Sequence, residues 1–510
     1  MLFRSDVPYQ LGRDINTYFP ALRAWEFFAF GGDKWQVSPK LTVDLGVRWE
    51  FYPPATPAFP GGFSNYDPTT NSLVVAGIGS NPSNLGMKTR YNYFAPRVGL
   101  AYRLTEKTVI RAGFGTSYTP FPDNTYAYNY PVRANNFYTN VGDGYATTLL
   151  ASGQAATFQQ GFPLPVPVTI PSNGIIPATG SLLSNSFDVI NLNFKNPYTE
   201  TWNIAAQQAL PGHWTLDVAY VGVHGVDTVA NIDLNNPFST LGGGTASKPL
   251  NILYGKTASA TLRWAGYSSS YNSLQAKLDR RFGNLLVNTV FTYGKAMNYQ
   301  TGDDGNLLWL INQRRSYARA DFDRTFNYNQ GFVYQLPWGV GMHWLKSGPA
   351  ASILGNWQLS GGVSVLSGTP FYISASGSSL NTPGETQTAN QVAAVQILHG
   401  INVGNPWFST ASFSQPTGVT FGSSGRNILT GPGLITVGLA LFKNFKIGER
   451  FNIQMRAETF NLANTPQFSN PQGSLTSSTF GYVTGTLGSG SGAVGTGGGR
   501  VLQLGAKVTF

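Results

Sequence analysis

The feature that most constrains the fold is an alternation of apolar and polar residues with a period of two, repeated in many segments of this 510-residue chain. In the last segment, 501–510 (VLQLGAKVTF), Leu504 lies on the apolar face and Lys507 on the polar face. Segment 41–51 (LTVDLGVRWEF) repeats the pattern with Arg and Glu on its polar face. A period of two predicts β-strands, and about ten residues match the length of a tilted transmembrane strand. Because a face that carries Arg and Glu cannot be a dry core, the pattern favours a membrane barrel with an apolar outside and a polar inside.

Composition supports strands rather than helices as the membrane-spanning elements. Charged residues make up 11% of the chain, which is less than half of the roughly 25% usual in soluble domains. No run of about eighteen apolar residues is present, so a transmembrane helix is not predicted. We therefore expect an all-β fold, an antiparallel transmembrane β-barrel whose apolar residues are spread over alternating strands. The alternative is a soluble β-sandwich.

Charge and cysteine content bear on the class of function. The net charge is +10, but Lys and Arg are scattered without a cluster, so nucleic acid is not an expected partner. The chain has no Cys, which excludes disulfides and thiol chemistry and suits an exported envelope protein. The N-terminal segment MLFRSDVPYQ has no basic region followed by an apolar core, so no signal peptide is predicted.

Short and long connections alternate along the chain. The short turns lie at 38–40, 105–107, 211–213, 282–284 and 448–450. The longest connections, rich in Gly, Pro, Ser, Thr and Asn, lie at 52–92, 120–197, 225–270, 369–432 and 464–499. This alternation is typical of periplasmic turns and extracellular loops. With the C-terminus in the periplasm, every long loop falls on the extracellular side, and only the connection 337–352 is long for a periplasmic turn.

The resulting strand count is odd. We expect strands near 24–36, 41–52, 93–103, 108–119, 198–210, 214–224, 271–282, 285–296, 322–336, 353–368 and 433–447, one beginning at Phe451, and 501–510. Bacterial barrels have even strand numbers, so we predict a partial barrel of about 13–14 strands with long extracellular loops. Segment 7–11 is the candidate for the end of a preceding strand. On this interpretation residues 1–510 are the C-terminal barrel part of a longer receptor and include no plug domain.

Several segments together resemble the TonB-dependent outer-membrane receptors of the Oar-like kind. The stretches that carry the resemblance are 25–54 (WEFFAFGGDKWQVSPKLTVDLGVRWEFYPP), 94–104 (FAPRVGLAYRL), 196–222 (NPYTETWNIAAQQALPGHWTLDVAYVG), 271–282 (YNSLQAKLDRRF), 355–371 (GNWQLSGGVSVLSGTPF), 425–433 (GRNILTGPG) and 451–468 (FNIQMRAETFNLANTPQF). The C-terminal Phe510 also resembles the terminal aromatic residue that the barrel assembly machinery reads in outer-membrane barrels.

The resemblance implies a receptor of the bacterial outer membrane, not an enzyme, that imports a large nutrient such as a siderophore, an oligosaccharide or a peptide. It also implies contact with outer-membrane lipid and lipopolysaccharide, and an inner-membrane energy-coupling protein that acts through the plug. The alternatives are a passive porin-like channel and a structural or surface-interaction protein. The long loops carry no recognisable motif, so the sequence names no nutrient.

The sequence predicts no catalytic or cofactor-binding site. The four histidines are scattered and none lies four residues from another, so no zinc motif is present. Gly490–Gly495 matches GxGxxG but lies in a Gly/Ser-rich segment without a βαβ unit. Asp321 and Asp323 are weak candidates for a Ca²⁺ site. Ion pairing with Arg is the alternative role for these two carboxylates.

Charged residues on the polar faces of the predicted strands are the candidates for the barrel lumen. They are Arg48, Glu50, Arg97, Arg111, Lys277, Asp279, Arg456 and Glu458. In a receptor such residues contact a plug or line a substrate path, whereas the alternative is a ladder of cross-strand ion pairs worth roughly 0.2–1 kcal/mol each. Aromatic residues within 118–138, among them Tyr118, Tyr126 and Tyr128, either clasp a sugar or peptide or form an interfacial girdle.

Overall fold

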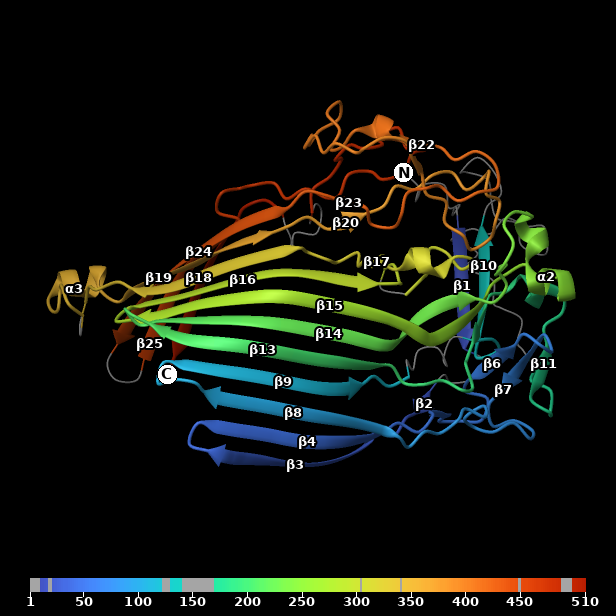
Figure 1. Ribbon diagram of the computed structural model, residues 1–510, viewed down its shortest axis with the longest axis horizontal. Helices are drawn as coiled ribbons and strands as arrows, with labels where there is room; N and C mark the ends of the chain where they lie inside the picture. Colours follow the sequence, from blue (N-terminus) through green and yellow to red (C-terminus); the bar gives the residue numbers. More distant parts are fainter. Residues whose placement is uncertain are drawn as a thin grey trace.

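The computed structural model describes residues 10–16, 21–121, 129–139, 169–302, 305–339, 342–447, 451–487 and 498–510. One large antiparallel sheet dominates it (Figure 1). Within the described residues thirteen of its strands form one continuous path, each paired with the next, and the short strands β12 (Phe187–Val189) and β17 (Ala318–Arg319) pair with β15 and β16 off this path. The thirteen are β3 (Phe27–Ser38), β4 (Leu41–Phe51), β8 (Tyr93–Arg103), β9 (Thr108–Tyr118), β13 (Tyr198–Leu210), β14 (Trp214–Asp233), β15 (Ala260–Phe282), β16 (Leu285–Asn298), β18 (Phe326–Gln335), β19 (Trp357–Leu366), β24 (Leu434–Ile447), β25 (Phe451–Phe460) and β26 (Val501–Thr509).

The remaining elements are short and belong to the connections. The strands are β1 (Gln10–Asn16), β2 (Leu22–Arg23), β5 (Thr56–Pro57), β6 (Ser64–Asp67), β7 (Ser72–Val75), β10 (Arg133–Thr139), β11 (Ile175–Pro177), β12 (Phe187–Val189), β17 (Ala318–Arg319), β20 (Pro370–Phe371), β21 (Asn390–Gln391), β22 (Phe413–Ser414) and β23 (Leu429–Thr430). The helices are α2 (Pro249–Tyr254), α3 (Pro349–Leu354) and the 3₁₀ turns η2 (Gly180–Ser184), η3 (Gly244–Ser247), η4 (Gln313–Ser316) and η5 (Thr410–Ser412).

The main sheet has an apolar face and a polar face. On β4, Leu45 and Val47 are exposed on one face, whereas Arg48 and Glu50 belong to the other. The register carries both faces from strand to strand, because Leu45 pairs with Val98 of β8. Exposed side chains of the apolar face include Leu45, Val47, Phe94, Val98, Phe114, Ile204, Val218, Leu274, Phe291, Ile435, Met455, Leu502, Leu504 and Val508. So extensive an exposed apolar surface suits contact with lipid rather than water.

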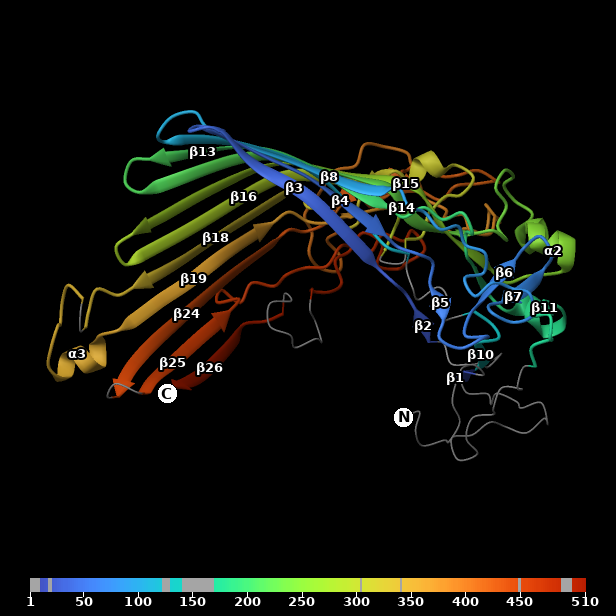
Figure 2. The same ribbon diagram turned by 90° about the horizontal axis from the view of Figure 1, so that it is seen from below.

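The sheet is an open arc with β3 and β26 at its two edges (Figure 2). Among the described residues, β26 pairs only with β25, and β3 pairs only with β4. The predicted partial barrel of antiparallel strands is therefore confirmed. Because β3 and β26 are the first and the thirteenth in a row of antiparallel strands, they run in the same direction.

The long connections gather at one end of the sheet, and the short turns lie at the other, together with the C-terminus (Figures 1 and 2). Buried apolar side chains concentrate in the long connections. Tyr66, Leu73 and Phe187 belong to one packed cluster there, and Trp407 and Phe408 to another. Since the strands direct their apolar side chains outward, the loops supply most of the hydrophobic core. This packing gives the long-loop end a folded structure of its own.

Two strands are much longer than the sequence suggests. We expected strands at 214–224 and 271–282 joined by a loop at 225–270, but β14 continues to Asp233 and β15 begins at Ala260. The hairpin continues past a β-bulge around Asp227. The added segments, GVDTVANID at 225–233 and ATLRWAGYSSS at 260–270, do not continue the alternation of the strands they extend, so only the pairing between the two strands reveals them.

One further expectation is corrected, and the connection 337–352 lies on the side where it was expected. Gln10 and Leu11 lie in β1, which pairs with β10 and not with the edge strand β3; residues 1–9 lie outside the described chain. The long connection between β18 and β19 lies at the short-turn end and contains α3 (Figure 1), which accounts for its length. The expected turn at 448–450 and the Gly490–Gly495 motif lie outside the described residues, as do Tyr126 and Tyr128.

Candidate functional site

The polar face of the main sheet collects all the lumen candidates. The register aligns Arg111 with Ala205, and Asp217 with Lys277, so this face continues unbroken across the strands. On it lie Arg48, Glu50, Arg97, Arg111, Lys277, Asp279, Arg456 and Glu458. The face opposite is the exposed apolar one. The eight positions therefore share one side of the sheet, as a lumen lining requires.

The ion pairs on this face run mostly along strands rather than across them. Three of them join residues two positions apart on one strand: Arg48–Glu50 at 3.3 Å, Lys277–Asp279 at 2.8 Å and Arg456–Glu458 at 3.6 Å. Arg111 instead reaches across β13, with Asp217 at 4.0 Å and a hydrogen bond of 2.9 Å to Gln207. Arg97 is exposed and has no ion pair within the described residues. Partly exposed pairs of this kind contribute at most about 1 kcal/mol each.

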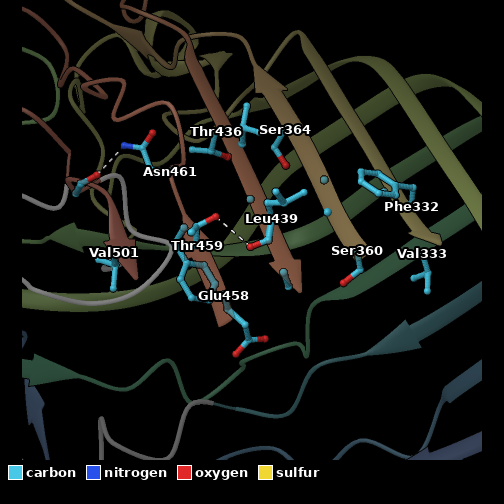
Figure 3. A pocket seen from close by; sticks show the side chains of 18 of the residues that line it. Phe332, Val333, Ser360, Ser364, Thr436, Leu439, Glu458, Thr459, Asn461 and Val501 are labelled. Atoms are coloured by element: carbon cyan, nitrogen blue, oxygen red, sulfur yellow. Dashed lines mark hydrogen bonds between the residues drawn. The ribbon is translucent and has the colours of Figure 1, made fainter. Parts of the chain in front are cut away.

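A cavity of about 830 Å³ opens on the polar face between β16 and β26 (Figure 3). Its floor contains Gly331, Gly362 and Gly438, which are directly paired across β18, β19 and β24. Beside them, Ser364 and Thr436 lie opposite each other on neighbouring strands. Three paired glycines leave the backbone of the sheet uncovered, so that a ligand or another chain segment can approach closely.

The walls of this cavity are mostly apolar, with a few hydroxyl and amide groups, and carry almost no charge. Among the described residues, Glu458 is the one charged residue that lines it. Two hydrogen bonds brace the side next to the 461–500 connection: Thr459 donates to the Leu439 carbonyl at 3.0 Å, and Asn461 donates to the Gly498 carbonyl at 3.0 Å (Figure 3). A single carboxylate cannot hold a metal ion by itself. The cavity suits an uncharged solute better than an ion.

Asp321 and Asp323 lie in the turn before β18 and are held by different partners. Asp323 bonds Arg319 at 2.9 Å and the Ala296 backbone N–H at 2.7 Å. Asp321 accepts hydrogen bonds from Arg426 at 2.8 Å and from Asn427 at 2.6 Å. Burial would raise the pKa of Asp321, but these hydrogen bonds and one from a backbone N–H keep it below the usual value. Within the described chain no three His, Asp or Glu side chains gather as metal ligands. Ion pairing with Arg is therefore the role that the geometry supports.

Arg426 is the central residue of the long-loop end, and the sequence did not reveal its role. Its side chain is fully buried. The guanidinium donates to Asn298 and to the carbonyls of Gln300 and Ser316, besides pairing with Asp321. It thereby joins the 367–433 connection to the 299–325 connection. A basic residue inside the otherwise Gly-rich and apolar segment GRNILTGPG was the available signal.

Lys256 is a second buried cation that the sequence did not reveal. It is fully buried, with its ammonium 4.1 Å from the ring centre of Phe187 and 5.5 Å from that of Tyr66. It also donates to the Asn185 carbonyl. These contacts join three connections in one cluster. The aromatic rings stabilise the ammonium charge, which burial alone would destabilise.

Phe510 lies at the short-turn end, beyond the last residue of β26. Its side chain is 92% exposed, and its ring centre is 6.4 Å from that of Phe451. A terminal aromatic side chain this accessible is available to a protein partner.

Comparison with known protein families identifies the class. The model described as "Outer membrane beta barrel domain" matches residues 3–503. The chain belongs to this family, and it is a β-barrel protein of the bacterial outer membrane. The prediction of an outer-membrane barrel is thus confirmed, and the soluble sandwich is excluded. Within the described residues no helix has the length and apolar character needed to cross a membrane.

Solved structures with a similar arrangement are outer-membrane receptors and transporters. The ferripyoverdine receptor of Pseudomonas aeruginosa has 10% identity and a TM-score of 0.44, with 96% of this chain and 39% of that chain covered. The siderophore receptor PirA of Acinetobacter baumannii has 12% identity and a TM-score of 0.42, with 95% and 45% covered. The chain spans less than half the length of these proteins. No curated protein matches it.

Proposed function

We propose that residues 1–510 form barrel strands and outer loops of an energy-coupled receptor that imports a large nutrient across the outer membrane. In this proposal the rest of the receptor supplies a plug, and an inner-membrane protein of the TonB type acts through that plug. The lumen is lined by the polar face that carries Arg48, Arg97 and Glu458. The protein has no catalytic role.

One observation carries the proposal. A polar sheet face with a large, nearly uncharged cavity lies behind an exposed apolar face, and packed loops cover one end of the sheet. Folded loops with their own cores present a fixed surface to a ligand, and binding residues are commonly carried on such loops. The two edges also support the proposal, because unpaired backbone groups in hydrocarbon cost several kcal/mol each. Further strands would pair with β3 and β26.

The proposal assigns four sets of partners. The apolar face contacts outer-membrane lipid, and lipopolysaccharide contacts its outer margin. The assembly machinery reads the exposed Phe510 at the end of β26. The coupling protein binds the plug rather than this chain. The nutrient is a siderophore, an oligosaccharide or a peptide.

The test is uptake by cells with and without the gene. The gene is deleted in its host, and uptake of labelled maltodextrins, xylo-oligosaccharides, tripeptides and ferric siderophores is measured with and without a protonophore. We expect at least one uptake activity to disappear on deletion, and the same activity to be abolished by the protonophore in the parent strain.

Two other outcomes would favour the alternatives. Loss of an uptake activity that the protonophore does not affect would indicate a passive porin-like channel. Unchanged uptake of all four classes, with altered adhesion or envelope integrity, would indicate a structural or surface-interaction protein.

A further inference from the structure

A second, smaller pocket lies where β8, β9 and β13 meet the long connections. Its volume is about 180 Å³, and it is lined by Tyr93, Tyr118, Asn196, Tyr198 and Asp227 together with Arg90, Asn92 and Lys195. That volume corresponds to about six water molecules. It suits one sugar ring or one amino acid, and it is too small for a whole siderophore.

Three tyrosine rings form one wall of this pocket. The ring centres of Tyr93 and Tyr118 are 4.7 Å apart, and those of Tyr118 and Tyr198 are 5.3 Å apart. Tyr118 and Tyr198 are paired directly across β9 and β13. Neighbouring phenol rings on a sheet give an apolar wall with polar hydroxyl tips, which suits the carbon–hydrogen face of a sugar ring.

Asn196 provides an unused hydrogen-bond donor at this wall. The residue is 93% buried. Its side-chain oxygen Oδ1 accepts a hydrogen bond of 3.1 Å from the Tyr93 hydroxyl, and the same hydroxyl accepts one from the Asn196 backbone N–H. The side-chain nitrogen of Asn196 has no partner within the described residues. A buried donor without an acceptor costs about 1–3 kcal/mol, so an acceptor on a ligand at this pocket would be favoured.

Asp227 faces the tyrosines from a distorted strand. It lies at the β-bulge of β14, between residues paired with Ser268 and Tyr267, and it has a left-handed backbone with φ of 53°. It has no ion pair among the described residues. Bulges at barrel rims commonly redirect a side chain towards a site. The unpaired Asp227 carboxylate is thereby available to accept hydrogen bonds from hydroxyl groups.

The charges around the pocket decide between ligand classes. The Arg90 guanidinium is anchored by Nε to the Phe194 carbonyl and by Nη2 to Asn193, so two of its three nitrogens are already engaged. Lys195 is exposed, whereas Asp227 is partly buried. An anionic ligand would be repelled by Asp227, and a hydroxyl-rich neutral ligand would find both an acceptor and a donor.

We propose that this rim pocket binds a single sugar ring, either free or as the end of an oligosaccharide. One pyranose face packs on the tyrosine wall, one or two hydroxyls donate to Asp227, and a sugar oxygen accepts from Asn196. The biological use of the pocket rests on the proposed receptor function, because this inference identifies the nutrient of that receptor as a saccharide. The binding itself requires neither a plug nor energy.

The experiment measures equilibrium binding of methyl hexopyranosides and methyl pentopyranosides to the protein in purified outer membranes. Two pocket variants are compared with two controls. Asp227→Asn keeps the shape and tolerates the left-handed backbone, and Tyr198→Ala removes one ring at a half-exposed position. Asp44→Asn and Tyr293→Ala change an exposed Asp and an exposed Tyr elsewhere on the sheet.

We expect at least one glycoside to bind in the millimolar range, and each pocket variant to weaken it about tenfold or more, as loss of a charge-assisted hydrogen bond or a ring contact implies. Both controls should bind as the parent does. The inference is overturned if no glycoside binds, if amino acids or anionic siderophore fragments bind instead, or if the controls weaken binding equally. Sugar binding without energised uptake would uphold this site while contradicting the proposed transport.

Discussion

At the scale of single residues, the buried cation Arg426 holds two long connections together. Both of its terminal nitrogens donate hydrogen bonds, to the carbonyls of Ser316 and Gln300 and to Asp321. Arg426→Met would leave the buried Ser316 and Gln300 carbonyls without this donor, and each buried acceptor left unsatisfied costs about 1–3 kcal/mol. We expect the 299–325 and 367–433 connections to become sensitive to protease, with the sheet intact. Arg103→Met, at an exposed site, is the control, and equal protease resistance of both variants would contradict this role.

Lys256 makes the loop cluster dependent on pH. Burial lowers the pKa of Lys256 to about 8, whereas an unfolded Lys titrates near ~10.4. Between these values the unfolded chain keeps a proton that the folded chain has released, so stability rises with pH. The apparent melting temperature should therefore increase between about pH 8 and pH 10.

The matched variants isolate this effect. Lys256→Met removes the titrating group, so the increase should shrink in that variant. Lys107→Met, at an exposed turn, should keep the increase of the parent protein. An identical pH profile in the parent and in Lys256→Met would show that the buried ammonium is not the cause.

At the scale of elements, neighbouring residues of one strand face different solvents. On β15, Leu274 is half exposed on the apolar face and pairs with Tyr220 and Tyr293, whereas Gln275 lies on the polar face. Leu274→Arg should destabilise the folded barrel by about 2–4 kcal/mol, because it places a charge in lipid. Gln275→Arg should be tolerated. The stability of both variants is measured as the fraction of protein that stays folded in a denaturant titration in lipid vesicles. An equal loss of stability in the two variants would argue against the assignment of the faces.

The strands also show where local sequence is a sufficient guide. Segments such as 41–51 alternate strictly, and the structure has a strand at Leu41–Phe51. The extensions of β14 and β15 were not predicted, because they depend on the pairing of these two strands with each other beyond the bulge in β14. The parity of the strands predicted that the lumen candidates share one face, but the alternative expected ion pairs across strands, whereas three pairs run along single strands. The pocket around Asn196 brings together residues about a hundred positions apart, and no local pattern indicates it.

At the scale of the whole molecule, the direction of the two edge strands opposes closure. β3 and β26 run in the same direction, so joining them would create a parallel seam in an antiparallel barrel. The chain has no Cys, which makes introduced cysteines unambiguous. We expect Lys34→Cys on β3 and Gln503→Cys on β26 to form no disulfide within one chain. A complete intramolecular disulfide would show that the thirteen strands close by themselves.

The positive control joins two strands that are already paired. Asp44 and Gly99 lie opposite each other on β4 and β8, and a Cβ at Gly99 would lie 3.3 Å from that of Asp44. This is close to the separation that a disulfide needs. Asp44→Cys combined with Gly99→Cys should therefore crosslink readily under the same oxidising conditions.

The sequence by itself determined the strands, their two faces and the alternation of short turns with long loops, because each depends on residue parity or on turn-forming residues close in the chain. It also determined the class of outer-membrane barrel, since an apolar face opposite charged residues has few other uses. Only the tertiary structure decided that Arg426 and Lys256 join the loops, and that Tyr93, Asn196 and Asp227 form a pocket. These features depend on contacts between distant segments, and such contacts are set by packing and register rather than by local pattern.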